Sequence, residues 1–233
     1  GDRETINLEL ILADLATVEK RLAKVEREAK SGNKEIIVLK NLLEKLKVQL
    51  ETGRAARELK LTDEEKKEIK NLGLLTIKPI IYVLNVKEEK PPLIPPLQGG
   101  QDCIKINAKL EAEISGLPEA EQAEYIKELG INQSGLDKLI KASYDILGLI
   151  TFLTTGADET RAWTVSRGVK APQAAGVIHT DFTKGFIRAE VINWQKFIEA
   201  GSEAKARELG WIKTEGKEYV IQDGDVCNFL INS

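Results

Sequence analysis

The segment RAWTVSRGVKAPQAAGVIHTDFTKGFIRAEV, residues 161–191, decides the fold of the last third of the chain. Its first residues, Arg161–Val165, are rich in strand formers and predict a strand of a hairpin. Pro172 suits the first turn of a helix, which we expect to run through Val177. Polar and apolar residues then alternate over 185–192, which is typical of a half-buried strand.

Further segments complete this pattern. A β-rich run at 149–154 precedes the segment, and a helix is expected at 193–200. We expect 218–221 and 226–231 to form a closing hairpin-like pair across the turn at 222–225. The order strand, strand, helix, strand, strand is that of a ubiquitin-like β-grasp domain.

The same segment resembles, almost residue for residue, the TGS domain that ends the YchF-type Obg-like ATPases, a branch of the P-loop nucleotide hydrolases. The resemblance covers residues 147–231 and is strongest there. It implies a cytoplasmic, ribosome-associated protein, bound to the large subunit or a 70S-like particle. The intact relative would be a Mg²⁺-dependent ATP hydrolase.

Composition agrees with a folded chain of two or three modules. The 233 residues are 42% hydrophobic and 30% charged, with a formal net charge of −3, which argues against a general nucleic-acid coat and hence against DNA. No apolar run reaches the ~18–20 residues of a membrane span. No signal peptide opens the chain, and two distant cysteines suit a reducing cytosol.

The first 50 residues carry two heptad seams. Leu8, Ile11, Leu15, Val18, Leu22 and Val25 form the first, and Ile36, Leu39, Leu43, Leu46 and Leu50 form the second. Since the break at 30–34 contains Gly and Asn, the pattern predicts an antiparallel helical hairpin. Residues 1–70 hold 16 Lys+Arg and 15 Asp+Glu, so this arm is not one-sidedly basic.

After the hairpin, Thr62 and Glu65 form a capping box that starts a helix ending at Gly73. The family resemblance implies a coiled-coil insertion within a nucleotide-binding domain here. Asp2–Leu10 (DRETINLEL) is similar to the family segment that leads into it.

The run 78–84 predicts a buried parallel strand, and the tetrapeptide Asn85-Val86-Lys87-Glu88 follows it directly. In P-loop GTPases, an Asn-Lys-x-Asp tetrapeptide at this place binds guanine through the Asp carboxylate. Glu88 carries one more methylene and moves that carboxylate, which removes the match to guanine. The tetrapeptide resembles the family's Asn-x-x-Glu, which implies ATP preference and a base contact from the Val86 backbone.

Ile104–Leu110 resembles the family's strand and base loop, in which Ala108 and Lys109 match and Asn107 replaces Ser. The resemblance therefore implies a base site of Asn85, Val86 and Glu88, supported by Ala108 and Lys109. Residues 90–101 depart from the family, because their prolines and glycines exclude the usual helix. Three helices are expected at 111–114, 118–129 and 135–147, the last with an apolar face that packs on the sheet.

No G-x-x-x-x-G-K-[ST] motif occurs, so we expect no ATP hydrolysis by this chain alone. By resemblance, the phosphate-binding loop and the metal-binding Asp would precede Gly1. The chain has no Met, which indicates a piece of a longer product, although a chain whose first residues are missing would look the same. No catalytic residue and no metal site is assigned, and the single histidine, His179, is expected to be structural or to lie at a domain interface.

Positive charge gathers in the quoted segment. From Arg161 to Arg188 there are five basic residues and one acidic residue, Asp181. The basic residues could contact ribosomal RNA if they share one face of the domain. They are Arg161, Arg167, Lys170, Lys184 and Arg188. Trp163 and Phe182 could stack on bases, but core positions are expected for both.

The sequence thus predicts a multidomain α+β and α/β protein. We expect a coiled-coil module at 1–72, the carboxyl-terminal half of an Obg-type P-loop nucleotide domain at 73–146, and a TGS domain at 147–233. The function implied is a ribosome-associated ATP-binding protein that prefers ATP to GTP. The alternative is a non-enzymatic module in which the coiled coil and TGS domain bind a ribosome, RNA or a protein.

Overall fold

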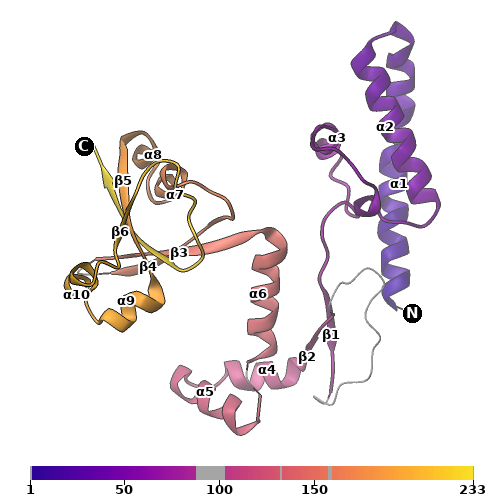
Figure 1. The fold of residues 1–233 in the computed structure, drawn as a ribbon. Coiled ribbons are helices and arrows are strands. Elements are labelled where there is room, and N and C mark those ends of the chain that lie inside the picture. The colour runs from indigo at the N-terminus through magenta and orange to yellow at the C-terminus, as the bar shows by residue number, and fades with distance from the viewer. Residues whose placement is uncertain (1, 88–102, 132, 157–158, 233) are drawn as a thin grey trace. The chain divides into compact units, whose positions relative to one another are not determined.

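The computed structural model describes residues 2–87, 103–131, 133–156 and 159–232 (Figure 1). The glutamate of the tetrapeptide, Glu88, and the Pro-rich run at 90–101 lie outside these residues. Two compact units divide the chain, Gly1–Ile80 and Ile81–Ser233. None of the described helices is long and apolar enough to cross a membrane.

The first unit is built on a helical hairpin, as expected from the heptad seams. Helix α1 (Asp2–Glu28) and the 3₁₀ turn η1 (Ala29–Ser31) lead to α2 (Lys34–Glu51), which packs beside α1 (Figure 1). Gly32 makes the reversal at φ 77°, a conformation that costs glycine little. Asn33 then caps α2 by accepting a hydrogen bond from the Glu35 amide at 2.9 Å.

The apolar seam forms the core of this unit. Val18, Val25, Leu43 and Leu46 are fully buried within it. Leu8 differs from the prediction, since its side chain is 51% exposed. The reason is length: α1 has 27 residues and α2 has 18, so the first turns of α1 have no α2 residues beside them.

The rest of the unit folds back on the hairpin. It contains η2 (Ala56–Glu58), α3 (Asp63–Ile69) and η3 (Lys70–Leu72). The capping box is confirmed, because Thr62 Oγ1 accepts from the Glu65 amide at 3.2 Å and Glu65 Oε2 accepts from the Thr62 amide at 2.9 Å. Gly73 ends the helix at φ 64°, as expected.

The second unit begins with a parallel pair of strands, β1 (Tyr82–Asn85) and β2 (Cys103–Ile106). Helices α4 (Ala108–Ser115), α5 (Glu119–Glu128) and α6 (Gly135–Leu147) follow. The parallel pairing is confirmed, but the expected burial of the first strand is wrong, since Val83 is 47% exposed. This pair has no further strand beside it among the described residues, so nothing there covers Val83.

The apolar side of α6 is also only partly covered. The helix contacts β2 and β3, yet Leu136, Ile140 and Leu147 are 48%, 50% and 64% exposed. The prediction that this helix packs on the sheet is confirmed by these contacts, but part of its apolar face stays exposed. A two-stranded ribbon is too narrow to cover a helix of 13 residues.

Five strands form the sheet of the carboxyl-terminal domain (Figure 1). They are β3 (Leu149–Thr155), β4 (Thr160–Ser166), β5 (Phe186–Asn193), β6 (Lys213–Glu215) and β7 (Asp225–Ile231), in the order β4-β3-β7-β5-β6. The central pair β3–β7 is parallel and its neighbours are antiparallel. This is the expected β-grasp arrangement, with the first and last strands side by side in the centre.

Helices cover both faces of this sheet. Helices α7 (Ala171–Ile178) and α8 (Thr180–Gly185) cover the first face, where Phe152, Ala175 and Ala189 are fully buried. Helices α9 (Trp194–Ala200) and α10 (Glu203–Glu208) cover the second face, around Ile192 and Val226. We call these the α7 face and the α9 face.

The closing segment differs from the prediction. Residues 218–221 do not form a strand with β7, and 220 makes only an isolated bridge to Lys170. The strand that completes the sheet is β6, which pairs with β5. Pattern reasoning missed β6, α8 and α10, because a strand of three residues and helices of six show no full period of hydrophobicity.

Candidate functional site

The end of β1 and the start of α4 meet through the side chain of Asn85. Its Oδ1 accepts a hydrogen bond from the Ala108 amide at 3.1 Å. The next amide, that of Val86, donates to the Ile106 carbonyl at 2.8 Å and so extends the β1–β2 ladder by one residue. Three of the residues predicted for base recognition, Asn85, Val86 and Ala108, are thus brought together.

The residue that replaces the family's Ser joins the same two segments. Asn107 caps α4, because its Oδ1 accepts from the Leu110 amide at 3.2 Å. Its Nδ2 donates to the Lys87 carbonyl at 3.3 Å. Asn107 thus both caps the helix and bonds to the tetrapeptide.

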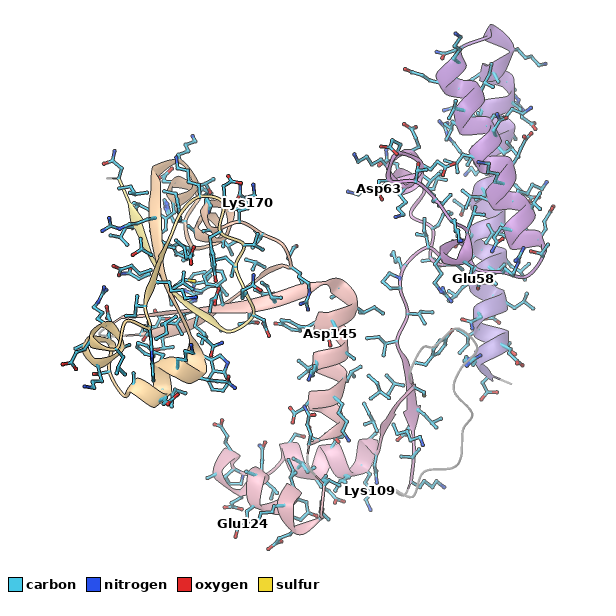
Figure 2. The ribbon with its side chains drawn as sticks, viewed as in Figure 1. Glu58, Asp63, Lys109, Glu124, Asp145 and Lys170 are labelled. Atoms are coloured by element: carbon cyan, nitrogen blue, oxygen red, sulfur yellow. The ribbon has the colours of Figure 1, made fainter. Side chains whose placement is uncertain are left out.

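Of the other two predicted residues, Lys109 takes no part in the hydrogen bonds of this network, and Glu88 is not described. Lys109 lies in the first turn of α4 (Figure 2), and its side chain is 89% exposed with Glu113 Oε1 3.9 Å away. Glu88 lies outside the described residues. The roles of Lys109 and Glu88 in base binding therefore stay predictions.

Glu111 fixes the position of α4 against α6. Its carboxylate accepts from the Gly135 amide at 2.6 Å and from the Leu136 amide at 3.2 Å, at the positive end of the α6 dipole. Ser134 caps the same helix by accepting from the Asp137 amide at 3.0 Å. A Cβ atom on Gly135 would lie 2.8 Å from Glu111 Oε1 and 3.1 Å from an Ile106 side-chain carbon, so this close approach requires glycine.

The sequence did not single out Glu111. Ser134 signals the start of a helix whose free amides need acceptors, but no spacing shows that a residue of an earlier helix supplies one. A groove lies beside this contact, lined by Val86, Lys105, Asn107, Glu111, Gln133 and Lys138 among others. The helix cap thus forms one wall of a groove that reaches the tetrapeptide.

The five basic residues do not share one face of the β-grasp sheet. Arg161 pairs with Thr154 across β3–β4, and alternate positions place it on the α7 face with Phe152. Arg188 pairs with Leu230 across β5–β7, and alternation places it on the α9 face with Ile192. The condition for one five-residue surface is therefore not met.

Lys170 occupies the N-cap position of α7 and Lys184 lies in the last turn of α8, so both belong to helices of the α7 face. Lys170 forms an ion pair with Glu218 at 2.5 Å, and Arg167 lies 3.7 Å from Asp145 (Figure 2 labels Lys170 and Asp145). Arg161 stacks over Trp163, with its guanidinium carbon 4.5 Å from the ring centroid. Three of the basic residues, Arg161, Lys170 and Lys184, thus belong to the α7 face, and Arg167 lies in the segment that leads from β4 to α7.

The aromatic residues and His179 have structural surroundings, as expected. Trp163 and Phe182 pack partly buried against the core of the α7 face, and Trp163 Nε1 donates to Thr154 Oγ1 at 2.9 Å. His179 precedes α8, and its Nδ1 accepts from the Asp181 amide at 3.3 Å. No group of three His, Cys, Asp or Glu among the described residues could hold a metal ion.

Comparison with known proteins gives the family. The model of the family YchF-GTPase_C, described as a protein of unknown function (DUF933), matches residues 149–232. The Ribosome-binding ATPase YchF of Bacillus subtilis (strain 168) is 46% identical over 245 residues, which cover 99% of this chain and 66% of the relative. Its counterpart in Escherichia coli O157:H7 is 44% identical over 239 residues, with the same two shares.

A solved structure agrees with these relatives. The Schizosaccharomyces pombe YchF GTPase has a TM-score of 0.85 and 33% identity, and the match covers 98% of this chain and 65% of that one. The chain thus spans about two thirds of the length of the relatives it matches. With a multidomain α/β fold and this identity over nearly its whole length, the chain belongs to the YchF family.

Proposed function

We propose that this chain supplies the base-recognition half of an ATP-binding, ribosome-associated protein that prefers ATP to GTP. The observation that carries the proposal is the contact between the Asn85 side chain and the Ala108 amide, which places the tetrapeptide beside the base loop. The Bacillus subtilis and Escherichia coli relatives are named ribosome-binding ATPases. Because ribosomes work in the cytoplasm, we propose a cytoplasmic location for this protein.

Some polar atoms of the tetrapeptide already form hydrogen bonds within the protein, and this determines which atoms remain to bind a base. Asn85 Oδ1 accepts from Ala108, so its Nδ2 is the group that can donate to N7, an acceptor that both purines share. The Val86 amide already donates to Ile106, so the contact expected from the Val86 backbone falls to its carbonyl. A carbonyl accepts from the 6-amino group of adenine, whereas the oxygen at the same place in guanine would face another acceptor.

Phosphate and metal binding need other groups. The sequence contains no P-loop motif, and the described residues offer no metal-binding cluster. Mg²⁺, when bound with ATP, would neutralise charge on the phosphates, but these residues do not fit it. We propose that the phosphates and Mg²⁺ bind to a segment that corresponds to the third of the YchF relatives outside the match with this chain.

The test is calorimetric titration of the full-length protein with ATP, GTP and purine riboside triphosphate, which lacks only the 6-amino group. We expect ATP to bind about tenfold or more tightly than either, since one unpaired buried polar group costs ~1–3 kcal/mol. The variant Glu88→Asp should reduce the difference in affinity between ATP and GTP. Circular dichroism checks that this variant is folded. Tighter binding of GTP than of ATP by the parent would show that the base assignment is wrong.

A further inference from the structure

Two side-chain amides cross between the tetrapeptide and the base loop. Asn85, at the end of β1, accepts from the Ala108 amide at the start of α4. Asn107, at the end of β2, donates to the Lys87 carbonyl. Each loop therefore contributes one side chain that bonds to the backbone of the other, and we call this arrangement the amide clamp.

The orientation of the Asn107 amide follows from its partners. Its Oδ1 lies 3.2 Å from the Leu110 amide nitrogen, and its Nδ2 lies 3.3 Å from the Lys87 carbonyl oxygen. Rotating the amide by half a turn would face N–H with N–H and carbonyl with carbonyl. Because one partner only donates and the other only accepts, a single orientation satisfies both.

The clamp extends the restraint on the tetrapeptide beyond the strand pair. The ladder of β1 and β2 ends with the bond from the Val86 amide to Ile106. The Asn107 bond then holds the carbonyl of Lys87, one residue further along. That carbonyl belongs to the planar peptide unit that joins Lys87 to the next residue, so the bond restrains the direction in which the chain leaves the strand.

We propose that Asn107 is a positioning residue for purine recognition, which sets the direction of the tetrapeptide through the Lys87 carbonyl. The inference rests on the proposed function. A serine at this position has a side chain one atom shorter and a single polar atom, whereas the asparagine amide bonds to both partners at once. Asn107 therefore couples the cap of α4 to the loop that recognises the base.

The variant Asn107→Asp separates the two contacts. Aspartate still accepts from the Leu110 amide and keeps the helix cap, but it cannot donate to Lys87. Asn107→Ala loses both contacts. Asn33→Ala is the matched control, because Asn33 caps α2 in the same way and lies in the other unit of the chain.

The full-length protein and these variants are titrated with ATP by calorimetry, and amide hydrogen exchange is followed at Val86 and Ala108. We expect Asn107→Asp and Asn107→Ala to bind ATP about fivefold to tenfold more weakly, as the loss of one hydrogen bond predicts. Exchange at both amides should be faster in each. Asn33→Ala should leave affinity and exchange unchanged.

Equal ATP affinity of Asn107→Asp and the parent would overturn the positioning role while leaving ATP binding established. If the parent binds no ATP, the proposed function fails instead. In that case faster exchange in Asn107→Asp still shows the clamp, and unchanged exchange overturns it.

Discussion

At the scale of single residues, Asp14 has the largest unforeseen role. Its side chain is 2% exposed in the middle of α1. Its Oδ1 accepts from the Leu75 amide at 2.7 Å, and its Oδ2 accepts from the Thr76 amide at 2.7 Å and the Thr76 hydroxyl at 2.6 Å. The Thr76 hydroxyl in turn accepts from the Ala56 amide at 3.0 Å, so one carboxylate holds two loops against the hairpin.

Asp14→Ala should destabilise the first unit by about 3 kcal/mol, because it leaves buried N–H and O–H donors without an acceptor. Denaturation followed by far-UV circular dichroism measures the loss. Glu9→Ala is the control, since Glu9 lies on the same helix and is exposed. A stability of Asp14→Ala within ~0.5 kcal/mol of the control would show that water satisfies these donors.

At the scale of elements, α10 is joined to the sheet by one arginine. Arg207 binds both carboxylate oxygens of Glu190 on β5, at 3.1 and 2.6 Å, and also contacts Glu203 at 2.8 Å. The hydrogen bond and charge of Arg207 lower the pKa of Glu190. A lowered pKa in the folded state adds stability above the ordinary pKa of Glu, and this stability is lost as the pH falls through the folded-state pKa.

Glu190→Gln should therefore cost about 1 kcal/mol or less near pH 7, because the Arg207 side chain is 46% exposed and solvent screens the pair. The difference in unfolding free energy between the variant and the parent should disappear as the pH falls below ~4. Tryptophan fluorescence follows this domain selectively, since Trp163, Trp194 and Trp211 are the three tryptophans of the chain. A gap that stays constant with pH would assign the loss to packing rather than to charge.

Hydrophobic periodicity predicted the long helices and strands. It failed for the short elements and for contacts between residues far apart in the sequence. The hairpin, α6 and the central strands of the β-grasp domain follow from heptad and alternating patterns. Asp14 lies three residues after Ile11 and four before Val18, so its place on the buried face could have been recognised. Its partners at 75 and 76 could not, because a contact across 62 residues leaves no local pattern.

The candidate base site shows the same division. A strand followed by Asn-x-x-Glu predicted where Asn85 lies, and the parallel pairing with β2 brought Ala108 to it. The capping of α6 by Glu111 was missed, because it depends on the angle between two helices rather than on spacing within one. For the basic residues, the local pattern did not predict which face of the sheet each strand position occupies, and that is what separates Arg161 from Arg188.

At the scale of the whole molecule, the charge distribution limits which surface of the β-grasp domain is expected to contact the ribosome. Arg161, Lys170 and Lys184 belong to the α7 face, and Arg167 lies in the segment between β4 and α7. Arg188 lies on the α9 face. An RNA surface on this domain should therefore lie on the α7 side. Neutralising residues there and on the opposite side distinguishes a local contact from a general effect of net charge.

The pair of substitutions Arg167→Gln and Lys170→Gln should weaken co-sedimentation with ribosomes and lower the slope of log affinity against log salt by about one per lost phosphate contact. The pair Arg188→Gln and Lys196→Gln removes the same charge from the α9 side and should change neither quantity. Each wild-type cation already has a carboxylate nearby, Asp145 for Arg167 and Glu218 for Lys170, so RNA would have to displace or share these partners. Equal weakening by both pairs would mean that net charge alone matters, and no weakening by either would place the ribosome contact outside these basic residues.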